Sequence, residues 1–415
     1  MIKVLWFTPT PSLAEGHLNN VPAGGGWIKS LEKELQGKVD LSIAFYYKRK
    51  MEPFTLGDTT YFPIYKYAKG VTARLAKKYF GLLEANEDVE TFLSIIERVK
   101  PDLIHVHGTE FPFGLVQARC TIPVVISIQG NITVYRHKYF SGISKGDARK
   151  FTGIRNWLRA DTKLHAFMRF TRQSSRERKI FSMASNLIGR TAWDRRITKV
   201  LSPKARYFHN DEILRDLFYE KKWSNQYTAG SVLKLFTTTG DSIYKGIETV
   251  IAAASLLDTN GIKYEWQIAG LHANDELVTM ASKSCGIARS PNLKFLHTVG
   301  EDVLVETLLK SHIYVACSHI ENSPNSLCEA LILGIPSIAT NAGGTASMMT
   351  DNVDGILIQD GDPYAMAGAV LELMENYHKA IEYGNNARQK ALKRHDKSVI
   401  VNDLLKIYNT VRKQH

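Results

Sequence analysis

The sequence predicts an α/β protein with two doubly wound parallel sheets, each in a domain of its own. In both halves of the chain, short apolar runs with strand character alternate with longer segments of helical character. Such alternation is typical of parallel sheets that are covered by helices on both faces. A polar and aromatic segment without clear periodicity, residues 219–230, separates the two halves. With 415 residues, the chain is long enough for two or three cores.

The first half is expected to begin with a buried strand at Lys3–Thr8, because this apolar run ends just before a proline. A loop with three consecutive glycines then leads into a helix at about 27–35. Further strands are expected at 39–45, 104–107, 124–128, 180–188 and 205–208. We therefore predict a first domain at residues 1–218.

The second half repeats this alternation, from a strand at 232–236 to about residue 394. We predict a second domain at residues 230–397. Ligands of doubly wound sheets bind outside the carboxyl ends of the strands, so the loops after the strands are the candidate sites.

The composition is that of an ordinary globular protein, with 44% hydrophobic and 23% charged residues. No apolar run is long enough to span a bilayer, and the N-terminal run is too short for a signal peptide. The four cysteines are scattered, without a C-x-x-C pair. We therefore expect a reduced, cytoplasmic protein without disulfides or structural zinc.

The net charge of +12 is concentrated in one region, because residues 136–206 contain 19 Lys and Arg against 4 Asp and Glu. Within 149–179, basic residues alternate with Trp, Phe and Leu. This pattern favours attachment to an anionic membrane surface, and a solvated helical hairpin with an ordinary core face is the alternative. No nucleic-acid-binding motif accompanies the charge, so we expect no nucleic acid partner.

The most informative segment runs from Glu321 to Pro336 and places two carboxylates, Glu321 and Glu329, on either side of an expected loop-to-helix junction. Ser323 is a good helix N-cap, and a proline follows it at the expected first helical position. The free amides of such a helix start can bind a diphosphate, while the carboxylates can bind hydroxyls. The pattern therefore suits a nucleotide sugar, and a solvated helix start with two surface acids is the alternative.

This segment resembles the E-x7-E signature of family 4 glycosyltransferases, which are retaining enzymes with the GT-B fold. Other elements of the family follow in order and spacing. They are Tyr244-Lys245-Gly246, Gln267–Gly270, Val299-Gly300, Pro336–Thr345 and Asp354–Pro363. The resemblance is strong over about 230–395 and weaker over 1–215, where it rests on the glycine loop and the strand at 102–108.

The resemblance implies a GT-B protein with two Rossmann-like domains facing across a cleft. The first domain would bind the acceptor, and a C-terminal helix at 398–415 would cross back to it. The activity implied is retaining transfer of a sugar from a nucleotide-sugar donor. The acceptor would be a glycan or a lipid-linked molecule, in surface polysaccharide (capsular type) or glycolipid synthesis. The enzyme would be cytoplasmic and peripheral at the inner face of the membrane.

The resemblance also assigns roles to residues on the donor side. Glu329 would bind the ribose hydroxyls, Glu321 would contact the donor sugar, and Lys245 would contact the diphosphate. Backbone amides and small polar groups would bind the sugar and the phosphates. These candidates are Gly25, Gly26, Gly240, Ser323, Asn325, Ser326, Gly343 and Gly344.

The chain departs from the family pattern at two positions. Gly240 stands where the family has an arginine, so backbone amides or a basic side chain from the first half would have to take over its role. Gln129 stands where many members have a histidine, which leaves sugar binding but no proton transfer at that position. Four residues near strand ends are the acceptor-side candidates, namely His107, Glu110, Gln129 and Asn131.

No metal is expected, although Asp360-Gly-Asp362 matches a D-x-D motif, because it lies far in sequence from the donor elements. Lys245 and the helix amides would carry the diphosphate charge instead. Two other functions remain open at this point. One is a catalytically silent GT-B subunit that binds a membrane or a partner enzyme, and the other is a nucleotide-sugar epimerase.

Overall fold

The computed structural model describes residues 1–18, 25–65, 71–80 and 87–413. Contacts divide the chain into two compact units. Unit 1 contains Met1–Arg136, Met168–Arg215 and His395–His415, and unit 2 contains His137–Phe167 and Asp216–Arg394.

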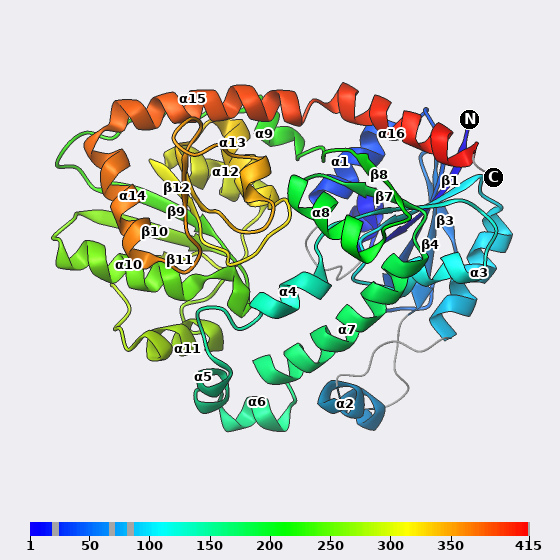
Figure 1. Cartoon of the computed structure of the whole chain (residues 1–415), viewed down its shortest axis with the longest axis horizontal. Coiled ribbons are helices and arrows are strands. Elements are labelled where there is room, and N and C mark those ends of the chain that lie inside the picture. Colours follow the sequence, from blue (N-terminus) through cyan, green and yellow to red (C-terminus); the bar gives the residue numbers. More distant parts are fainter. Residues whose placement is uncertain (19–24, 66–70, 81–86, 414–415) are drawn as a thin grey trace. The chain divides into compact units, whose positions relative to one another are not determined.

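Unit 1 is built on an eight-stranded sheet with the order β3-β4-β2-β1-β5-β6-β7-β8 (Figure 1). Its strand pairs are parallel, except for the antiparallel pair β3–β4. The strands are β1 (Lys3–Thr8), β2 (Asp40–Tyr47), β3 (Phe54–Leu56), β4 (Thr59–Tyr65), β5 (Leu103–His107), β6 (Val124–Ser127), β7 (Asn186–Gly189) and β8 (Arg206–His209). The sheet changes direction of winding between β1 and β5, so the loops after these strands meet at its carboxyl edge.

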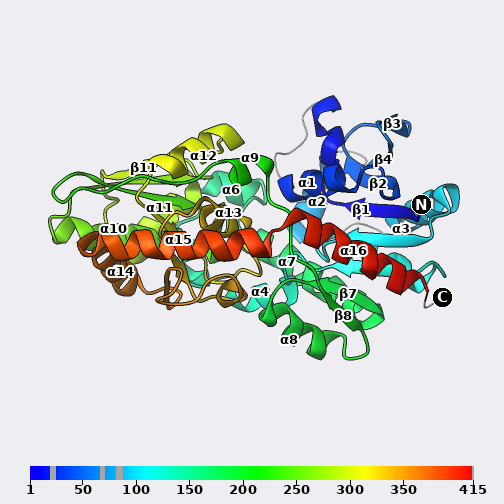
Figure 2. The same ribbon diagram turned by 90° about the horizontal axis from the view of Figure 1, so that it is seen from above.

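Unit 1 also contains several α-helices. They are α1 (Gly26–Leu35), α2 (Val71–Phe80), α3 (Glu87–Val99), α8 (Ala192–Leu201) and α16 (Lys397–Arg412), together with most of α4 (Ile132–Lys138) and α7 (Lys163–Met183). Helix α16 packs on α1 and β5 (Figure 2). Tyr408 of α16 accepts a hydrogen bond from Trp6 Nε1 of β1 (3.0 Å) and lies 2.7 Å from His105 Nδ1. These buried contacts fix the last helix to the first strands.

Unit 2 contains a parallel sheet with the order β11-β10-β9-β12-β13-β14. Its strands are β9 (Leu233–Thr238), β10 (Tyr264–Ala269), β11 (Leu293–Phe295), β12 (Ile313–Ala316), β13 (Ser337–Thr340) and β14 (Ile356–Ile358). In chain order this is the 3-2-1-4-5-6 arrangement of the dinucleotide-binding folds, with its switch point between β9 and β12. Any ligand of unit 2 is therefore expected beside the loops that follow these two strands.

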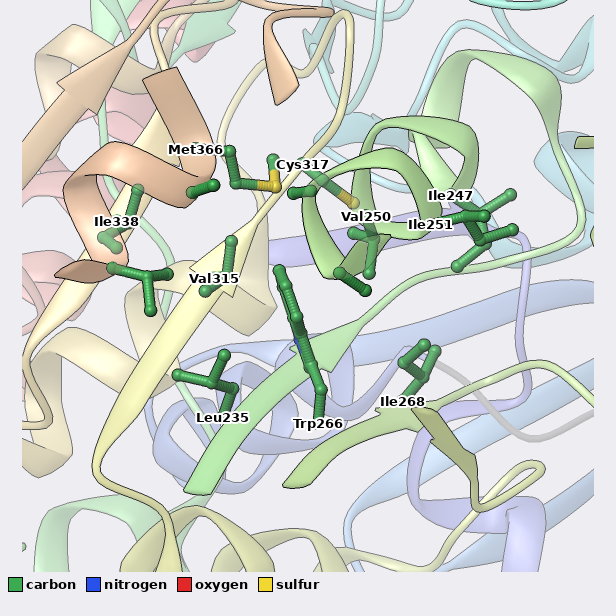
Figure 3. Close-up of a cluster of buried hydrophobic side chains, with 14 of the residues drawn as sticks. Leu235, Ile247, Val250, Ile251, Trp266, Ile268, Val315, Cys317, Ile338 and Met366 are labelled. Carbon is green, nitrogen blue, oxygen red and sulfur yellow. The ribbon is translucent and has the colours of Figure 1, made fainter. Parts of the chain in front are cut away.

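Helices and strands of unit 2 share a core centred on Trp266 (Figure 3). Leu235 and Val315 of the strands lie beside Trp266, with Ile338 and Met366 on one side of the cluster and Val250 and Ile251 on the other. The helices of this unit are α5 (Lys145–Lys150), α6 (Ile154–Leu158), α9 (Asp216–Glu220), α10 (Ile247–Thr259), α11 (Glu276–Cys285), α12 (Glu301–Lys310), α13 (Asn325–Leu333), α14 (Pro363–Glu375) and α15 (Tyr377–Arg394).

The units differ from the predicted division at 137–167, which lies within the expected first domain but packs on unit 2. The reason is apolar burial, because Ile143 and Ala148 are fully buried in the core of unit 2. The expected linker at 219–230 is also held by this unit. Trp223 is buried, its backbone N–H donates to Leu333 (2.9 Å) and its indole N–H donates to Ser311 (2.8 Å).

The predicted strand at 180–188 is wrong over most of its length. Helix α7 continues to Met183, and only Asn186–Gly189 forms a strand. Ile180 and Phe181 are buried, so the apolar run is the core-facing side of a helix end rather than a strand. Within the described part of the chain, no helix is long and apolar enough to cross a bilayer.

Candidate functional site

The switch point of the unit 2 sheet brings together two side chains from distant loops. Lys245 ends a short turn after β9, and Glu321 lies in the loop after β12. The ammonium group of Lys245 forms an ion pair with Glu321 Oε1, and the Ser318 hydroxyl lies 3.2 Å from the same oxygen. The structure therefore places the two expected catalytic residues next to each other.

Two glycines allow the loops to approach each other this closely. Gly246 has φ 76°, and a Cβ there would overlap the carbonyl oxygen of Cys317. Gly343 has φ 62°, and a Cβ there would overlap the carbonyl oxygen of Glu321, which also accepts the N–H of Gly344 (2.8 Å). Only glycine fits these positions, since other residues rarely adopt such φ values and would collide with backbone.

Lys245 stays positively charged in this site. Burial lowers its pKa, but the Glu321 carboxylate and other nearby groups outweigh this effect, so the pKa of Lys245 is raised overall. The ion pair is not fully enclosed, because 31% of the Lys245 side chain and 14% of the Glu321 side chain are exposed. An incoming anion can therefore reach the ammonium group.

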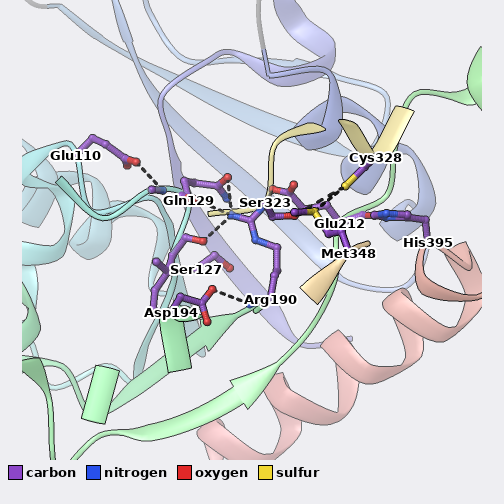
Figure 4. A network of polar contacts seen from close by, with 12 residues as sticks. Glu110, Ser127, Gln129, Arg190, Asp194, Glu212, Ser323, Cys328, Met348 and His395 are labelled. Carbon is purple, nitrogen blue, oxygen red and sulfur yellow. Dashed lines mark hydrogen bonds and ion pairs between the residues drawn. The ribbon is translucent and has the colours of Figure 1, made fainter. Parts of the chain in front are cut away.

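Helix α13 begins one residue later than predicted. Pro324, not Ser323, is the N-cap, and its carbonyl accepts the N–H groups of Leu327 and Cys328 (both 3.1 Å). The Ser323 hydroxyl makes no cap and lies 3.5 Å from Met348 Sδ (Figure 4). A proline at the N-cap has no side-chain acceptor, so the first amides of α13 have no side-chain cap.

The start of α13 contains two of the expected phosphate-side residues. Asn325 and Ser326 occupy its first two positions, where N–H groups have no acceptor within the helix. The side-chain oxygen of Asn325 is also buried without a hydrogen-bond partner. Free amides at a helix start favour an anion, so this edge of unit 2 is suited to a phosphate group.

Glu329 lies one turn further along α13 and is buried, with 5% of its surface exposed. Glu321 is also largely covered. The alternative of two solvated surface acids therefore does not hold. Burying a carboxylate is costly, and such residues are typical of sites that bind a ligand or a fixed hydrogen-bond network.

The position of Gly240 is open, and a Cβ there would touch nothing within 4 Å. The next residue, Asp241, binds Lys163 through both its carboxylate (2.5 Å) and its carbonyl oxygen (2.9 Å). A basic side chain from the first half of the sequence thus lies beside the position where the family has an arginine.

A buried charge network next to the site escaped the sequence reasoning. His319, two residues before Glu321, lies 2.6 Å from Glu248 and 3.3 Å from Asp360, and Lys138 pairs with the same aspartate (3.1 Å). Burial lowers the pKa of His319, but the two carboxylates outweigh it and the pKa is raised. The sequence signal was a histidine in the loop after β12, beside the carboxylate motif.

The two aspartates of the D-x-D motif both have other partners. Asp360 belongs to the network with His319 and Lys138, and Asp362 caps α14 by accepting a backbone N–H (2.9 Å). Within the described ranges, no group of three His, Cys, Asp or Glu residues could hold a metal ion.

In unit 1, the glycine loop after β1 is only partly described, because Gly24 lies outside the described residues. Gly25 has φ 73° and is the N-cap of α1, which begins at Gly26. A Cβ at Gly25 would lie 2.6 Å from Thr10 Oγ1, and one at Gly26 would lie 2.8 Å from Arg215 Cδ. Gly25 is therefore favoured by its backbone conformation, whereas the contact at Gly26 is with the flexible side chain of Arg215.

The two histidines of β5 are both buried and neutral. His105 lies between the hydroxyl groups of Tyr408 and Ser127, and burial lowers its pKa to about 3. His107 packs between the rings of Trp6 and Trp27, and burial also lowers its pKa. Neither nitrogen of His107 has a hydrogen-bond partner, although the ring borders a small cavity of about 30 Å³.

Gln129 is held in place by Arg190, a residue that the sequence reasoning missed. The Arg190 guanidinium donates to the Gln129 side-chain oxygen (3.0 Å) and pairs with the buried Glu212 (Figure 4). With its oxygen fixed on Arg190, the amide group of Gln129 points its donors elsewhere. The only sequence signal was an arginine directly after β7, at the carboxyl edge of the sheet.

Glu110 and Asn131 occupy the same edge. Glu110 accepts the N–H of Gly130 (3.1 Å), and burial, together with nearby Glu177, raises the pKa of Glu110 to about 7. Asn131 is fully buried and accepts the N–H of Val134 (3.1 Å) at the start of α4. Glu110 is thus poised to gain or lose a proton near neutral pH. The side-chain nitrogen of Asn131 is buried without a hydrogen-bond partner.

The basic stretch 149–179 does not form one amphipathic helix. Gly153 begins α6, and the Thr162 hydroxyl accepts the N–H of His165 (3.2 Å) at the start of α7, so the chain turns twice. Phe167 is half-buried, and its ring packs against that of Tyr139, with 5.1 Å between the ring centres.

Two apolar side chains of α6 remain exposed. Ile154 and Leu158 are 79% and 71% exposed, and their spacing places them on one side of the helix. Arg155 and Arg159 beside them are exposed as well. We call these four residues the α6 tip.

Comparisons with known proteins give a family match in the second half of the chain and fold matches over the whole chain. Residues 234–390 match the family model Glycosyl transferases group 1. The capsular polysaccharide biosynthesis glycosyltransferase CapM of Staphylococcus aureus is 22% identical over 170 residues, which cover 41% of this chain and 44% of CapM. The chain thus matches less than half of the length of this relative.

Solved structures match over the full length. A sucrose-phosphate synthase from Thermosynechococcus elongatus has a TM-score of 0.68 at 14% identity and covers all of both chains. HepE from Anabaena, in complex with UDP and glucose, has a TM-score of 0.65 at 13% identity and covers 99% of this chain and all of HepE. The two parallel sheets and these neighbours identify the fold as GT-B.

Replacing Glu329 should weaken nucleotide binding. Glu329→Ala is expected to reduce affinity for the best of UDP, GDP and ADP by about tenfold or more, since hydrogen bonds to a charged group contribute about 1.5–3 kcal/mol. Glu329→Gln, which keeps the size of the side chain, should lose less. Calorimetry measures the affinities, with Glu375→Ala on the exposed end of α14 as the control. Wild-type affinity in folded Glu329→Ala would remove this residue from the site.

Proposed function

We propose that this protein is a retaining hexosyltransferase that moves a sugar from a nucleotide-sugar donor to a glycan or lipid-linked acceptor. The observation that carries the proposal is the Lys245–Glu321 pair at the unit 2 switch point, beside the uncapped start of α13. A cation and free amides suit a diphosphate, and a carboxylate beside them suits a sugar.

The ion pair suggests how donor binding prepares the site. Without a ligand, Glu321 neutralises Lys245. A diphosphate that binds at α13 attracts the ammonium group, and Glu321 is then released toward the donor sugar. As the bond to the leaving diphosphate breaks, Lys245 stabilises the growing negative charge and Glu321 stabilises the cationic sugar.

The buried Glu329 supports the nucleotide part of the proposal. Its place one turn into α13 sets a second carboxylate behind the phosphate-binding amides. There it would accept hydrogen bonds from the ribose hydroxyls. Donor phosphates, donor sugar and ribose would then each have their own group on one loop and helix of unit 2.

Gln129 and Glu110 would act on the acceptor side. Arg190 fixes the orientation of Gln129, which can then hydrogen-bond a sugar hydroxyl without titrating. The proposed stereochemistry, in which the transferred sugar retains its anomeric configuration, follows from the family resemblance of the donor loops.

The acceptor class is proposed from similar proteins. CapM is named for capsular polysaccharide biosynthesis, and a phosphatidyl-myo-inositol mannosyltransferase of Mycolicibacterium smegmatis is 26% identical over 179 residues. Both names fit the synthesis of surface polysaccharides or glycolipids.

Glu321→Gln should reduce turnover more than donor affinity, because its charge matters most when the sugar becomes cationic. We expect kcat to fall by at least about a hundredfold while the nucleotide Kd stays within about threefold. Donor hydrolysis without acceptor, measured as release of nucleoside diphosphate, is the first assay. Ser318→Ala, which removes only a neighbour of Glu321, is the matched control. Unchanged turnover in Glu321→Gln would assign Glu321 a structural role.

We further propose that transfer needs no metal ion, because Lys245 and the α13 amides balance the diphosphate charge. Asp360 and Asp362, the candidate ligands, already have structural partners. Donor hydrolysis should therefore persist after dialysis against EDTA. Loss of activity that returns with Mg²⁺ or Mn²⁺, and not with Na⁺, would contradict this proposal.

The α6 tip is proposed as the contact with an anionic membrane surface. Ile154 and Leu158 would insert between headgroups, while Arg155 and Arg159 would contact lipid phosphates at about 1 kcal/mol each. Binding to phosphatidylcholine vesicles with 30% phosphatidylglycerol should fall at least about fivefold in Ile154→Ser/Leu158→Ser, and further in Arg155→Glu/Arg159→Glu. Vesicle co-sedimentation measures it, with Arg172→Glu/Arg178→Glu on α7 as the control. Equal binding by all variants would exclude the tip.

A further inference from the structure

A groove of about 480 Å³ lies between α8 and the strand β8 of unit 1. Arg195, Arg196 and Lys199 line it from the helix, and Tyr207 and His209 line it from the strand. The volume is within the range of small-molecule sites, about 300–1,000 Å³, but the lining is more cationic than such sites usually are. β8 is the last strand of the sheet, so no further described strand covers this side.

The three basic side chains of α8 carry most of the charge of the groove, whereas His209 pairs with Asp211 (2.9 Å). Among the residues that the structure describes, Arg195, Arg196 and Lys199 take part in no ion pair, and all three side chains are exposed. Asp194, the acidic residue of α8, is fully buried. It caps the helix and accepts the Tyr207 hydroxyl (2.6 Å).

Tyr207 gives the groove an aromatic wall that stays neutral. Its hydroxyl is held by Asp194, and burial together with this carboxylate raises the pKa of Tyr207. The guanidinium group of Arg195 lies 6.0 Å from the centre of the ring. An aromatic face beside guanidinium groups suits a sugar ring that bears a negative charge.

The groove starts at the acceptor side of unit 1. Thr191 and Ala192, at its beginning, directly follow Arg190, which holds Gln129. From Ala192 to Lys199, the helix advances about 10 Å. The groove therefore leads away from the carboxyl edge of the sheet over a length that can hold more than one ring.

We propose that this groove binds a negatively charged sugar residue of the acceptor, at a distance from the hydroxyl that receives the transferred sugar. The inference rests on the proposed glycosyl transfer and adds the chemical class of its acceptor. Arg196 and Lys199 bind the phosphate or carboxylate, and the ring packs on Tyr207. The acceptor is therefore an anionic glycan rather than a neutral one.

Calorimetry with the full-length protein tests the groove directly. Glucose 6-phosphate and glucuronate are the charged probes, and glucose is the neutral control. The groove variant is Arg195→Gln/Arg196→Gln/Lys199→Gln. The matched control, Lys406→Gln/Arg412→Gln/Lys413→Gln, removes three exposed charges from α16 and its C-cap in the same unit. We expect the groove variant to bind a charged probe at least about tenfold more weakly than the wild type and the control variant.

The proposal would be overturned if the groove variant bound both charged probes as tightly as the wild type does. It would also be overturned if the wild type bound glucose as tightly as it binds the charged probes. The proposal would also be overturned if the wild type bound phosphatidylglycerol vesicles but neither charged sugar, and the groove variant lost the vesicle binding. The ligand of the groove would then be a lipid headgroup. Nucleotide affinity and donor hydrolysis should stay unchanged in the groove variant. If the wild type neither binds a nucleotide nor hydrolyses a nucleotide-sugar donor, the proposed function fails, whereas the sugar-binding result still decides the groove proposal.

Discussion

The close approach of two backbone loops at the unit 2 switch point is the constraint on which the candidate site depends. Gly246 faces the carbonyl group of Cys317, and Gly343 faces that of Glu321, at distances that exclude any side chain. These contacts set the ends of β9, β12 and β13 against one another. Lys245 and Glu321 meet because the nearby glycines let their loops approach each other. Since the loops already hold the two side chains close together, the side chains lose little conformational freedom when they pair.

Much of this arrangement could be predicted from local sequence. The alternation of apolar runs predicted both parallel sheets, and the E-x7-E segment predicted that Glu321 would sit in a loop and Glu329 in a helix. The predictions failed where one local signal had two interpretations. The run at 180–188 is a helix end followed by a short strand. Ser323 was a plausible N-cap, but α13 begins one residue later than predicted and Pro324 is its N-cap. The side chain of Ser323 therefore does not cap the helix.

The interactions that sequence reasoning missed are tertiary. Arg190 and Gln129 are 61 residues apart in sequence, and His319 and Asp360 are 41 apart, so no local pattern links them. These contacts bear on the two departures from the family pattern. Lys163 lies beside Asp241, next to the glycine that replaces an arginine, and Arg190 orients the glutamine that replaces a histidine. A changed residue can thus be accompanied by a partner that is distant along the chain.

The path of the chain has a consequence for how the protein can be divided. The boundaries of the two units fall after residues 136, 167, 215 and 394, so the backbone passes between them four times. A fragment that begins at residue 216 would lack Ile143 and Ala148, and its core would be left with a gap lined by apolar side chains. A fragment that ends at residue 215 would expose the same two side chains to water and would lack α16, which covers Trp6. Neither half is a self-sufficient module, and recombination that exchanged one unit between such proteins would need crossover points at all four passages rather than at one.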